Sequence, residues 1–352
     1  MKRLASGLLL LSLAACARGT QTNGPSTTYV PAEPGERHLT NIRQLTVGGN
    51  NAEAYFSISG KQLIYQRQNE VDAGCDQEYI MNIDGSDQRR ISNGYGRTTC
   101  GMFYADDKRV LYSSTFANDS ACPLPPDRSH GYVWPLGRLE IYTSKPDGSD
   151  LQPLTGNGAY NAEATLSPDG KRIIFTSTRD GDIELYTMNV DGADVRRLTN
   201  RVGYDGGAWF SPDGTQIVWR AAYPKTAADT ADYLTLLGRR LVRPARVEVW
   251  VADADGGNAR QITSLGGANF APIFTPDGKK IIFSSNYEQP RSGNFDLYLI
   301  NPDGTGLEKV TTHPDFDSFP MFSPDGRKLV WASNRNQTMP GETNIFIADW
   351  VE

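Results

Sequence analysis

The sequence predicts an all-β fold, a six-bladed β-propeller of four-stranded blades, on three observations. A Ser/Thr-Pro-Asp-Gly turn recurs along the chain, a second turn ending in Asp-Gly follows, and no helical hydrophobic period separates the two. The 352 residues include 35 Gly and 21 Pro, which are too many chain-bending residues for a helical bundle. A small repeated unit that cannot bury its own hydrophobic face indicates repeats packed side by side around one core.

The first turn of each unit joins its first two strands, a and b. Proline presets φ at the second position, aspartate tolerates the bridge region and glycine adopts positive φ, which together are typical of a hairpin turn. An apolar run follows each turn and predicts strand b. Complete copies of the turn lie at residues 167–170, 211–214, 275–278 and 323–326, and degenerate copies lie at 57–60 and 104–107.

The second turn joins strands c and d. It is followed by a short signature of a polar residue or proline, an aliphatic residue and Thr or Ser, as in Arg197-Leu198-Thr199. Each unit therefore holds four short strands with fixed a–b and c–d turns. The second turns lie at 82–85, 145–148, 189–192, 253–256 and 301–304, and the signatures at 90–92, 153–155, 197–199, 261–263 and 309–311.

The sixth unit stops where its c–d turn should begin, at residues 348–350, so its strand d is missing. An isolated signature, residues 42–46, precedes the first unit. We therefore expect an N-terminal strand to complete the last blade and close a propeller over residues 41–352. A closed ring leaves no open sheet edge for pairing with another chain, and we expect a monomer.

The N-terminus has the features of an export signal. Lys2 and Arg3 precede an apolar run of 12 residues from Leu4 to Ala15, which is too short to cross a bilayer. The run ends in Leu-Ala-Ala-Cys16, which resembles the lipobox of bacterial lipoproteins and implies lipidation of Cys16. Cleavage after Ala17 as an ordinary signal peptide is the alternative.

These features predict a signal peptide over residues 1–15 and a lipidated cysteine with a flexible tether over 16–40. Ala17 follows the cysteine, and under the Gram-negative sorting rule this favours the outer membrane. We expect an exported, lipid-anchored protein that faces the periplasm or the cell surface.

The unit from Leu166 to Thr199 resembles the WD-like propeller repeat of the TolB family, and related repeats occur in the propellers of prolyl-oligopeptidase-type peptidases. The resemblance extends over about residues 42–352. It implies a TolB-like propeller, and TolB is the periplasmic component of the Tol–Pal system. The expected lipoprotein signal and tether stand here in place of the N-terminal α/β domain of TolB.

The two ends of the predicted disc differ. The a–b and c–d turns are nearly uniform and define a smooth face, whereas the b–c and d–a connections vary and define an insert face. Variable loops on a rigid scaffold usually carry function. Two b–c connections are much longer than the others, at about residues 115–138 in blade 2 and 221–246 in blade 4, and the candidate contact residues within them are Arg128, His130, Trp134, Arg239 and Arg240.

The blade 4 insert also predicts a helix. Leu234, Leu237 and Leu241 have helical spacing, and Pro244 provides a stop. The helix is interpreted either as a lid or docking surface, or as a helix that lies on the rim of the disc with solvated arginines.

Alignment of the units reveals two rings of residues on strand a, the innermost strand of each blade. The polar ring comprises Asn51, Thr98, Asn161, Asp205, Asn269 and Asp317. The channel ring, two residues later, comprises Glu53, Cys100, Glu163, Gly207, Ala271 and Phe319. We expect the polar ring together with Glu53 and Glu163 to surround the channel mouth and bind a cation, an amine or a peptide N-terminus. Alternatively, the Asn and Asp side chains cap the d–a turns.

Three cysteines follow the signal: Cys75, Cys100 and Cys122. An exported protein permits a disulfide, three cysteines leave one over, and the sequence leaves the pairing open. A metal site shared with His130 is the alternative, although the spacing matches no recognised zinc pattern.

No G-x-S-x-G, H-E-x-x-H or P-loop motif is present, so no catalytic residue, cofactor or metal centre is predicted. The formal net charge of −6 gives no basic excess for nucleic acid. We therefore predict a membrane-anchored scaffold that binds a protein or peptide in the cell envelope. The alternatives are a hydrolase or lyase with a metal or acidic site at the channel mouth, where Glu53 or Glu163 is the base, and a glycan-binding module that uses aromatic residues there (Tyr160, Tyr204, Phe316 and Phe319).

Overall fold

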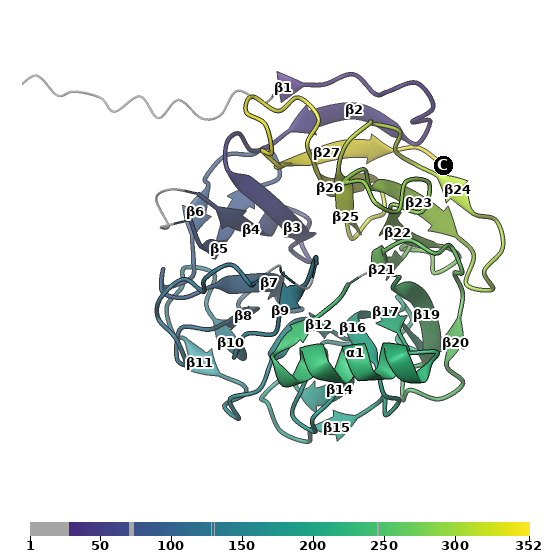
Figure 1. Cartoon of the computed structure of the whole chain (residues 1–352). Coiled ribbons are helices and arrows are strands. Elements are labelled where there is room, and N and C mark those ends of the chain that lie inside the picture. The colour runs from purple at the N-terminus through teal and green to yellow at the C-terminus, as the bar shows by residue number, and fades with distance from the viewer. Residues whose placement is uncertain (1–27, 70–73, 128, 130, 245) are drawn as a thin grey trace, which may run out of the picture.

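The computed structural model describes residues 28–69, 74–127, 129, 131–244 and 246–352. Six antiparallel sheets are arranged as blades around a central channel, which confirms the predicted all-β propeller (Figure 1). Strand a of each blade lies closest to the channel. The hydrophobic core lies between neighbouring blades, as where Ala54 and Leu63 of blade 1 pack with Val330 and Ile345 of blade 6.

The first three blades follow the predicted a-b-c-d order. Blade 1 consists of β3 (Asn50–Phe56), β4 (Gln62–Gln68), β5 (Asp76–Asn82) and β6 (Arg89–Arg90). Blade 2 consists of β7 (Thr98–Phe103), β8 (Val110–Ser114), β10 (Glu140–Ser144) and β11 (Gln152–Pro153). Blade 3 consists of β12 (Asn161–Leu166), β13 (Arg172–Ser177), β14 (Glu184–Asn189) and β15 (Arg196–Arg197).

The other blades repeat this order. Blade 4 consists of β16 (Tyr204–Phe210), β17 (Gln216–Ala222), β19 (Glu248–Asp253) and β20 (Arg260–Gln261). Blade 5 consists of β21 (Asn269–Phe274), β22 (Ile281–Ser285), β23 (Asp296–Ile300) and β24 (Glu308–Lys309). Blade 6 consists of β25 (Asp317–Phe322), β26 (Lys328–Ser333), β27 (Asn344–Trp350), β2 (Leu39–Gln44) and β1 (Thr28–Tyr29).

Blade 6 is closed by the N-terminal strand, as predicted. β2 pairs antiparallel with β27, where Gln44 is the partner of Phe346. Thr46 then donates its hydroxyl to Asn344 Oδ1 at 3.0 Å and accepts the backbone N–H of Ile345 at 2.9 Å. The signature threonines of blades 2 and 4, Thr155 and Thr263, accept the equivalent N–H at 2.9 and 2.8 Å. The N-terminal strand therefore takes the place of strand d.

The folded body begins earlier than the predicted boundary at residue 41. β1 pairs with β2, and His38 is buried against Trp350 with 4.7 Å between ring centroids. Glu36 makes a buried ion pair with Arg335 at 2.8 Å. The tether prediction is corrected accordingly, because residues from Thr28 onward belong to blade 6. The predicted signal peptide and Cys16 lie outside the described residues.

The two long inserts meet each other. The blade 2 insert contains β9 (Trp134–Pro135), which pairs antiparallel with β18 (Leu241–Val242) of the blade 4 insert. Helix α1 (Ala227–Gly238) precedes β18, begins with a capping box between Thr226 and Asp229, and lies over blades 3 and 4 (Figure 1).

The helix prediction needs two corrections. Leu234 is half exposed, and Leu241 lies in β18 instead of the helix. Leu236 is the buried residue of α1, and Leu237 packs beside it against the cluster under the inserts. The helix therefore covers the end of the disc through residues other than those that its leucine spacing indicated.

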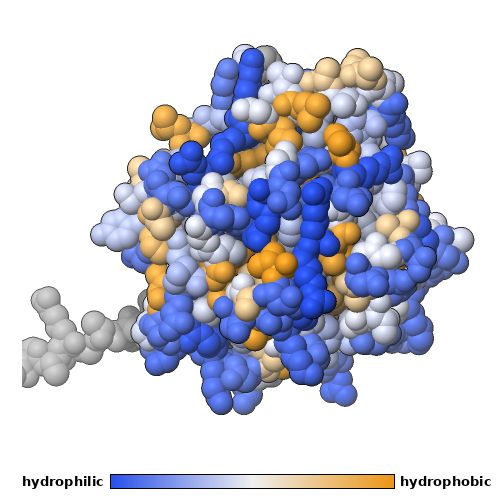
Figure 2. Space-filling view, turned by 90° about the horizontal axis from the view of Figure 1, so that it is seen from below, coloured by the Kyte–Doolittle hydropathy of each residue, from blue (hydrophilic) through white to orange (hydrophobic). Residues whose placement is uncertain are grey.

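The flank of the disc at the bottom of Figure 1 is covered mainly by hydrophilic residues, with small apolar areas between them (Figure 2). Within the described parts of the chain, no helix has the length and hydropathy needed to cross a bilayer.

Candidate functional site

The channel widens on the insert face into a cavity of about 940 Å³. Cavities of this size accept a small molecule or a short segment of another chain. Strand a of every blade contributes one channel-ring residue to the cavity wall, and the two inserts and the b–c loop of blade 5 supply its upper part. The cavity wall is thus formed partly by the repeated strands and partly by the variable loops.

Two aromatic residues from opposite blades meet at the lower end of the cavity. Tyr55 on β3 of blade 1 contacts Trp209 on β16 of blade 4 edge to face, with 5.3 Å between ring centroids. Because blades 1 and 4 face each other across a six-membered ring, this contact spans the channel. The contact therefore narrows the channel between the cavity and the smooth face.

All six channel-ring residues line the cavity because strand a has the same bulge in every blade. A bulge leaves one residue outside the ladder and redirects its side chain. That residue has positive φ in each blade, with values of 51° at Glu53, 59° at Cys100, 56° at Glu163, 63° at Gly207, 51° at Ala271 and 55° at Phe319. Five of the six are not glycine, and such strained backbone is typical of functional sites.

The wall formed by blades 1 and 2 is acidic. Burial raises the pKa of Glu53 to about 7, a hydrogen bond from the Cys100 thiol opposes this rise, and the charge of Glu163 adds to it. Beside it, Asp76 makes an ion pair with Arg97 at 3.0 Å. Glu53 makes no ion pair with any described residue. A carboxylate that accepts a proton near neutral pH therefore faces the cavity.

The wall formed by blades 3 and 4 holds a buried ion pair. Glu163 pairs with Arg220 and also accepts the Thr176 hydroxyl at 2.8 Å and the Gly207 N–H at 2.9 Å. A Cβ atom at position 207 would overlap the Arg220 guanidinium, which explains why this channel-ring position is glycine. Arg220 also lies 5.6 Å from the ring centroid of Trp134 in the blade 2 insert.

Blades 5 and 6 form an aromatic wall of Phe270, Phe295, Phe316 and Phe319. Phe270 contacts Phe295 and Phe319 with centroid distances of 5.0 and 5.4 Å, and Phe316 contacts Phe295 at 5.8 Å. Such edge-to-face pairs hold the rings in place. The cavity is thus apolar on one side and charged on the other.

The paired inserts cover the upper part of the cavity. Trp134 and Pro135 from β9 line it together with Arg243 and Pro244, which follow β18. Arg243 is held by the helix through an ion pair with Asp232 at 3.3 Å. The two-stranded pairing therefore fixes a cover that neither insert forms by itself.

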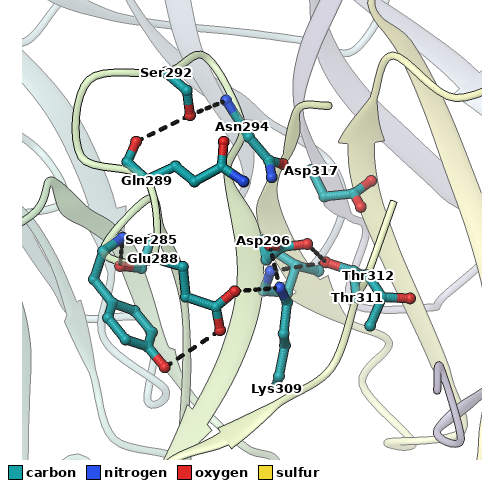
Figure 3. A network of polar contacts seen from close by, with 12 residues as sticks. Ser285, Glu288, Gln289, Ser292, Asn294, Asp296, Lys309, Thr311, Thr312 and Asp317 are labelled. Carbon is teal, nitrogen blue, oxygen red and sulfur yellow. Dashed lines mark hydrogen bonds and ion pairs between the residues drawn. The ribbon is translucent and has the colours of Figure 1, made fainter. Parts of the chain in front are cut away.

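The b–c loop of blade 5 completes the rim. Lys309 on β24 contacts Glu288 in this loop at 2.9 Å and Asp296 at the start of β23 at 2.7 Å (Figure 3). Ser292 within the loop donates to Gln289 O and accepts the Asn294 N–H. These contacts anchor a loop that sequence analysis did not single out, and its residues 290–293 face the cavity.

The polar ring does not face the cavity, which corrects the expectation for Asn51, Thr98, Asn161, Asp205, Asn269 and Asp317. All six side chains are fully buried. They connect strand a to strand b or to the preceding blade: Asn161 donates to Glu140 of blade 2 at 3.0 Å, and Asn269 donates to Glu248 of blade 4 at 3.0 Å. They join strands within a blade or neighbouring blades, and Asn51 also donates to Gly48 O in the d–a connection at 3.0 Å, as the capping alternative predicts.

The other predicted residues are dispersed. Arg239 and Arg240 are exposed at the end of α1, Trp134 lines the cavity, and Arg128 and His130 lie outside the described residues. Cys75 and Cys122 form a disulfide that joins the blade 1 b–c loop to the blade 2 insert, and Cys100 is free. Among the described residues, no group of three or more His, Cys, Asp or Glu side chains is placed to hold a metal ion.

Sequence reasoning missed several cavity residues. Arg220, Trp209 and Phe270 lie on strands, where the repeat marks their neighbours as core positions. The available signal was a charged residue inside the apolar run of a strand b, as Arg220 is in β17. A buried arginine of this kind requires a buried acid, here Glu163.

The sequence matches the family described as "TolB beta propeller domain" over residues 133–230 and 242–350. It is 25% identical over 202 residues to a protein TolB homolog from Chlorobium luteolum, which covers 57% of this chain and 40% of the homolog. The chain therefore spans less than half the length of that relative.

Solved structures show the same fold. The structure of putative TolB from Agrobacterium tumefaciens has a TM-score of 0.56 at 18% identity, covering 86% of this chain and 91% of that one. Oligogalacturonate lyase from Vibrio parahaemolyticus has a TM-score of 0.54 at 13% identity, covering 92% and 96%. Both a TolB protein and an enzyme therefore share this architecture.

Proposed function

The chain belongs to the TolB beta propeller domain family, and we propose that its propeller is a scaffold that binds a protein or peptide partner of the cell envelope on the insert face. The observation that carries this proposal is the cavity under the paired inserts. It is narrowed below by the contact of Tyr55 with Trp209, and the variable loops line its upper part. A rigid body with one elaborated, hollow face is suited to binding.

Exposed apolar side chains also support the insert face as the binding surface. Leu124 and Tyr132 in the blade 2 insert, Tyr95 in the connection to blade 2, and Met339 in the b–c loop of blade 6 are each at least 61% exposed. On the smooth face, Ile58 is 49% exposed. Of these residues, Tyr132 also lines the cavity, and an exposed apolar side chain beside a hollow is suited to an interaction surface.

The proposal includes export and anchoring through Cys16. The lipobox-like sequence before Cys16 supports it, and the resemblance to a periplasmic protein family is consistent with it. Once residues 28–40 are part of blade 6, the expected tether comprises about residues 17–27. Metabolic labelling with a fatty-acid probe tests the anchor, because Cys16→Ser should abolish labelling and leave the propeller folded.

Site-specific photo-crosslinking in intact cells tests the binding face. A photoreactive phenylalanine analogue in place of Tyr132 should capture a partner protein in a discrete adduct. The same analogue in place of Ile58, an exposed apolar residue on the smooth face, is the matched control and should capture none. Adducts at Ile58 with none at Tyr132, Leu124 or Met339 would contradict the proposal.

A catalytic role is the second candidate, because Glu53 has a pKa of about 7 and lines the cavity. A carboxylate of this kind suits a general base in a hydrolase or lyase. If the protein is an enzyme of this class, Glu53→Gln should abolish turnover of a substrate while retaining its binding. Retained turnover in that variant would exclude Glu53 as the base.

A further inference from the structure

Resting on the proposed function, we infer that the cavity takes a ligand with a protonated amine attached to an apolar or aromatic group, with the amine on Glu53 and the apolar group on the phenylalanine wall. This inference names the chemistry that the site recognises. The molecule that carries this amine is either a free small amine or a peptide, and the experiment below separates the two.

The charges of the cavity favour a cation at Glu53. The other two acids of the wall already have partners, since Asp76 pairs with Arg97 and Glu163 pairs with Arg220. Glu53 receives a hydrogen bond from the Cys100 thiol but forms no ion pair with any residue that the structure describes. Glu53 is half-buried, and a carboxylate in such a place without an ion-pair partner is costly, so a cationic ligand at this point gains a favourable interaction.

The arginines of the cavity compensate Glu53 only in part: Arg220, which is paired with Glu163, lowers the pKa of Glu53, and burial outweighs this effect. Arg243 at the cover is engaged by Asp232, and Arg291 is exposed on the rim. Behind Glu53, Glu78 on β5 is fully buried and accepts the Gly101 N–H at 3.1 Å. Burial raises the pKa of Glu78 well above its usual range, and Glu78 lies outside the cavity wall, so Glu53 is the acid of the wall that has no ion-pair partner among the described residues.

The phenylalanine wall lies next to this acid. Strands β3 and β25 pack against each other, so Glu53 of blade 1 and Phe319 of blade 6 are neighbours in the channel ring. Aromatic faces attract cations, and they also bury the apolar part of an amine. A carboxylate beside aromatic rings is a pattern suited to substituted ammonium groups.

Binding should depend on pH through Glu53. The groups that act on it are Cys100, Glu78, Asp76 with Arg97, and Glu163 with Arg220. Only the ionised carboxylate attracts an amine strongly. Because the pKa of Glu53 is about 7, its ionised fraction rises about tenfold from pH 6 to pH 8, and the affinity should rise by the same factor.

Calorimetric titration of the full-length, detergent-solubilised protein tests the inference. The probe is 2-phenylethylamine, whose amine stays protonated over this pH range, and 2-phenylethanol is its uncharged match. At pH 8 we expect the amine to bind at least tenfold more tightly than the alcohol. Glu53→Gln should remove this preference and the pH dependence together, whereas Glu33→Gln, which removes an exposed carboxylate outside the cavity, should leave both unchanged.

A second variant tests the aromatic wall. Phe316→Leu should weaken amine binding several-fold and keep the pH dependence, because the carboxylate is intact. Equal binding of the amine and the alcohol, unchanged affinity in Glu53→Gln, or no binding of the amine would each overturn the inference. Partner capture at Tyr132 is measured independently, so the proposed binding face can stand when this inference fails.

Binding measurements with a tripeptide at pH 7 determine whether the ligand is a peptide or a small amine. The tripeptide Phe-Gly-Gly presents a free N-terminal amine on an aromatic residue, and its N-acetylated form does not. If the tripeptide binds more tightly than 2-phenylethylamine and acetylation abolishes its binding, the source is a peptide N-terminus. If 2-phenylethylamine binds and the tripeptide does not, the source is a small amine.

Discussion

The polar ring and the channel ring lie only two residues apart on the same six strands, yet they have different roles. The polar ring is polar in all six blades, and every member is buried between or within blades. The channel ring contains two Glu, a Cys, a Gly, an Ala and a Phe, and every member faces the cavity. In this propeller, the ring with the same kind of residue in every blade holds the strands and blades together. The ring with different residue types in each blade forms the surface of the cavity.

The bulge in strand a separates the two rings. In a regular strand, residues two apart point to the same side, so both rings should have faced the channel. The extra residue at each bulge turns the second one into the channel and leaves the first inside the blade. The predictions that follow test this division, from the largest expected effect to the smallest.

Removal of a polar-ring carboxylate should destabilise the fold most. Asp317 pairs with Arg335 at 3.0 Å and accepts the Trp331 indole N–H at 3.0 Å. Asp317→Ala leaves that buried arginine with Glu36 as its one acidic partner among the described residues, and we expect a loss of roughly 3–5 kcal/mol in the free energy of unfolding. Urea unfolding measures it. Glu53→Gln, in the channel ring, removes no ion pair between described residues and should not lower this free energy, because burial already raises the pKa of Glu53. An equal loss in both variants would refute the division.

A second polar-ring acid should make stability depend on pH. Burial raises the pKa of Asp205 to about 7, although hydrogen bonds from Tyr223 and Trp219 lower it in part. The folded state binds the proton of Asp205 more tightly than the unfolded state does. The protonated carboxyl therefore makes its full contribution to the free energy of unfolding below about pH 4, and this contribution is lost as the pH rises to 7. Between these limits the wild type should lose on the order of 3 kcal/mol more than Asp205→Asn. Thermal unfolding at both pH values measures it, and parallel pH profiles would contradict this assignment.

Gly207→Ala should disturb the channel ring locally. Its φ is 63°, and an added Cβ would overlap the Arg220 guanidinium. Displacing Arg220 weakens its pair with Glu163, so we expect a loss of about 1–3 kcal/mol in unfolding free energy. The tryptophan fluorescence should also change, because Arg220 lies over Trp134. A crystal structure of the variant with Arg220 unmoved would argue against this explanation.

The smallest effect should have the opposite sign. Ala271 occupies the same channel-ring position in blade 5 with φ of 51°. Ala271→Gly relieves left-handed backbone strain of about 1 kcal/mol. The greater conformational entropy of the unfolded variant opposes this gain by a somewhat smaller free energy. A net stabilisation of about 0.5 kcal/mol is therefore expected. Differential scanning calorimetry measures the shift. A lower melting temperature would show that the methyl group of Ala271 packs more favourably than the strain costs.

Much of the fold was predictable because it depends on turns whose residue types are recognisable in the sequence. The Pro-Asp-Gly turns fixed the strands of each blade, and the isolated Ile42–Thr46 signature indicated ring closure, which the pairing of β2 with β27 confirms. The earlier part of blade 6 was not predictable. β1 is held by β2, whose paired residues lie 14 to 16 positions later, and His38 is held by Trp350 and Glu308, which lie 312 and 270 positions later. The sequence of this segment itself resembles a linker.

The candidate site was predicted only in part. Glu53 and Glu163 were identified as channel residues by alignment of the units, and the structure places both in the cavity wall. The polar ring was assigned to the same surface because the sequence carries no mark of the bulge, which here occurs at Glu, Cys, Ala and Phe as well as at Gly. The Cys75–Cys122 pairing was likewise one of several that the spacing allowed.

The sequence by itself determined the number of blades, their strand order and the difference between the two faces, because turns and strand periodicity depend on residues close together in the chain. Only the tertiary structure decided which strand-a side chains reach the channel, that the two inserts pair through Trp134 and Val242, and that Tyr55 meets Trp209 across it. These contacts join residues over 100 positions apart, and their geometry depends on how six blades pack around one axis.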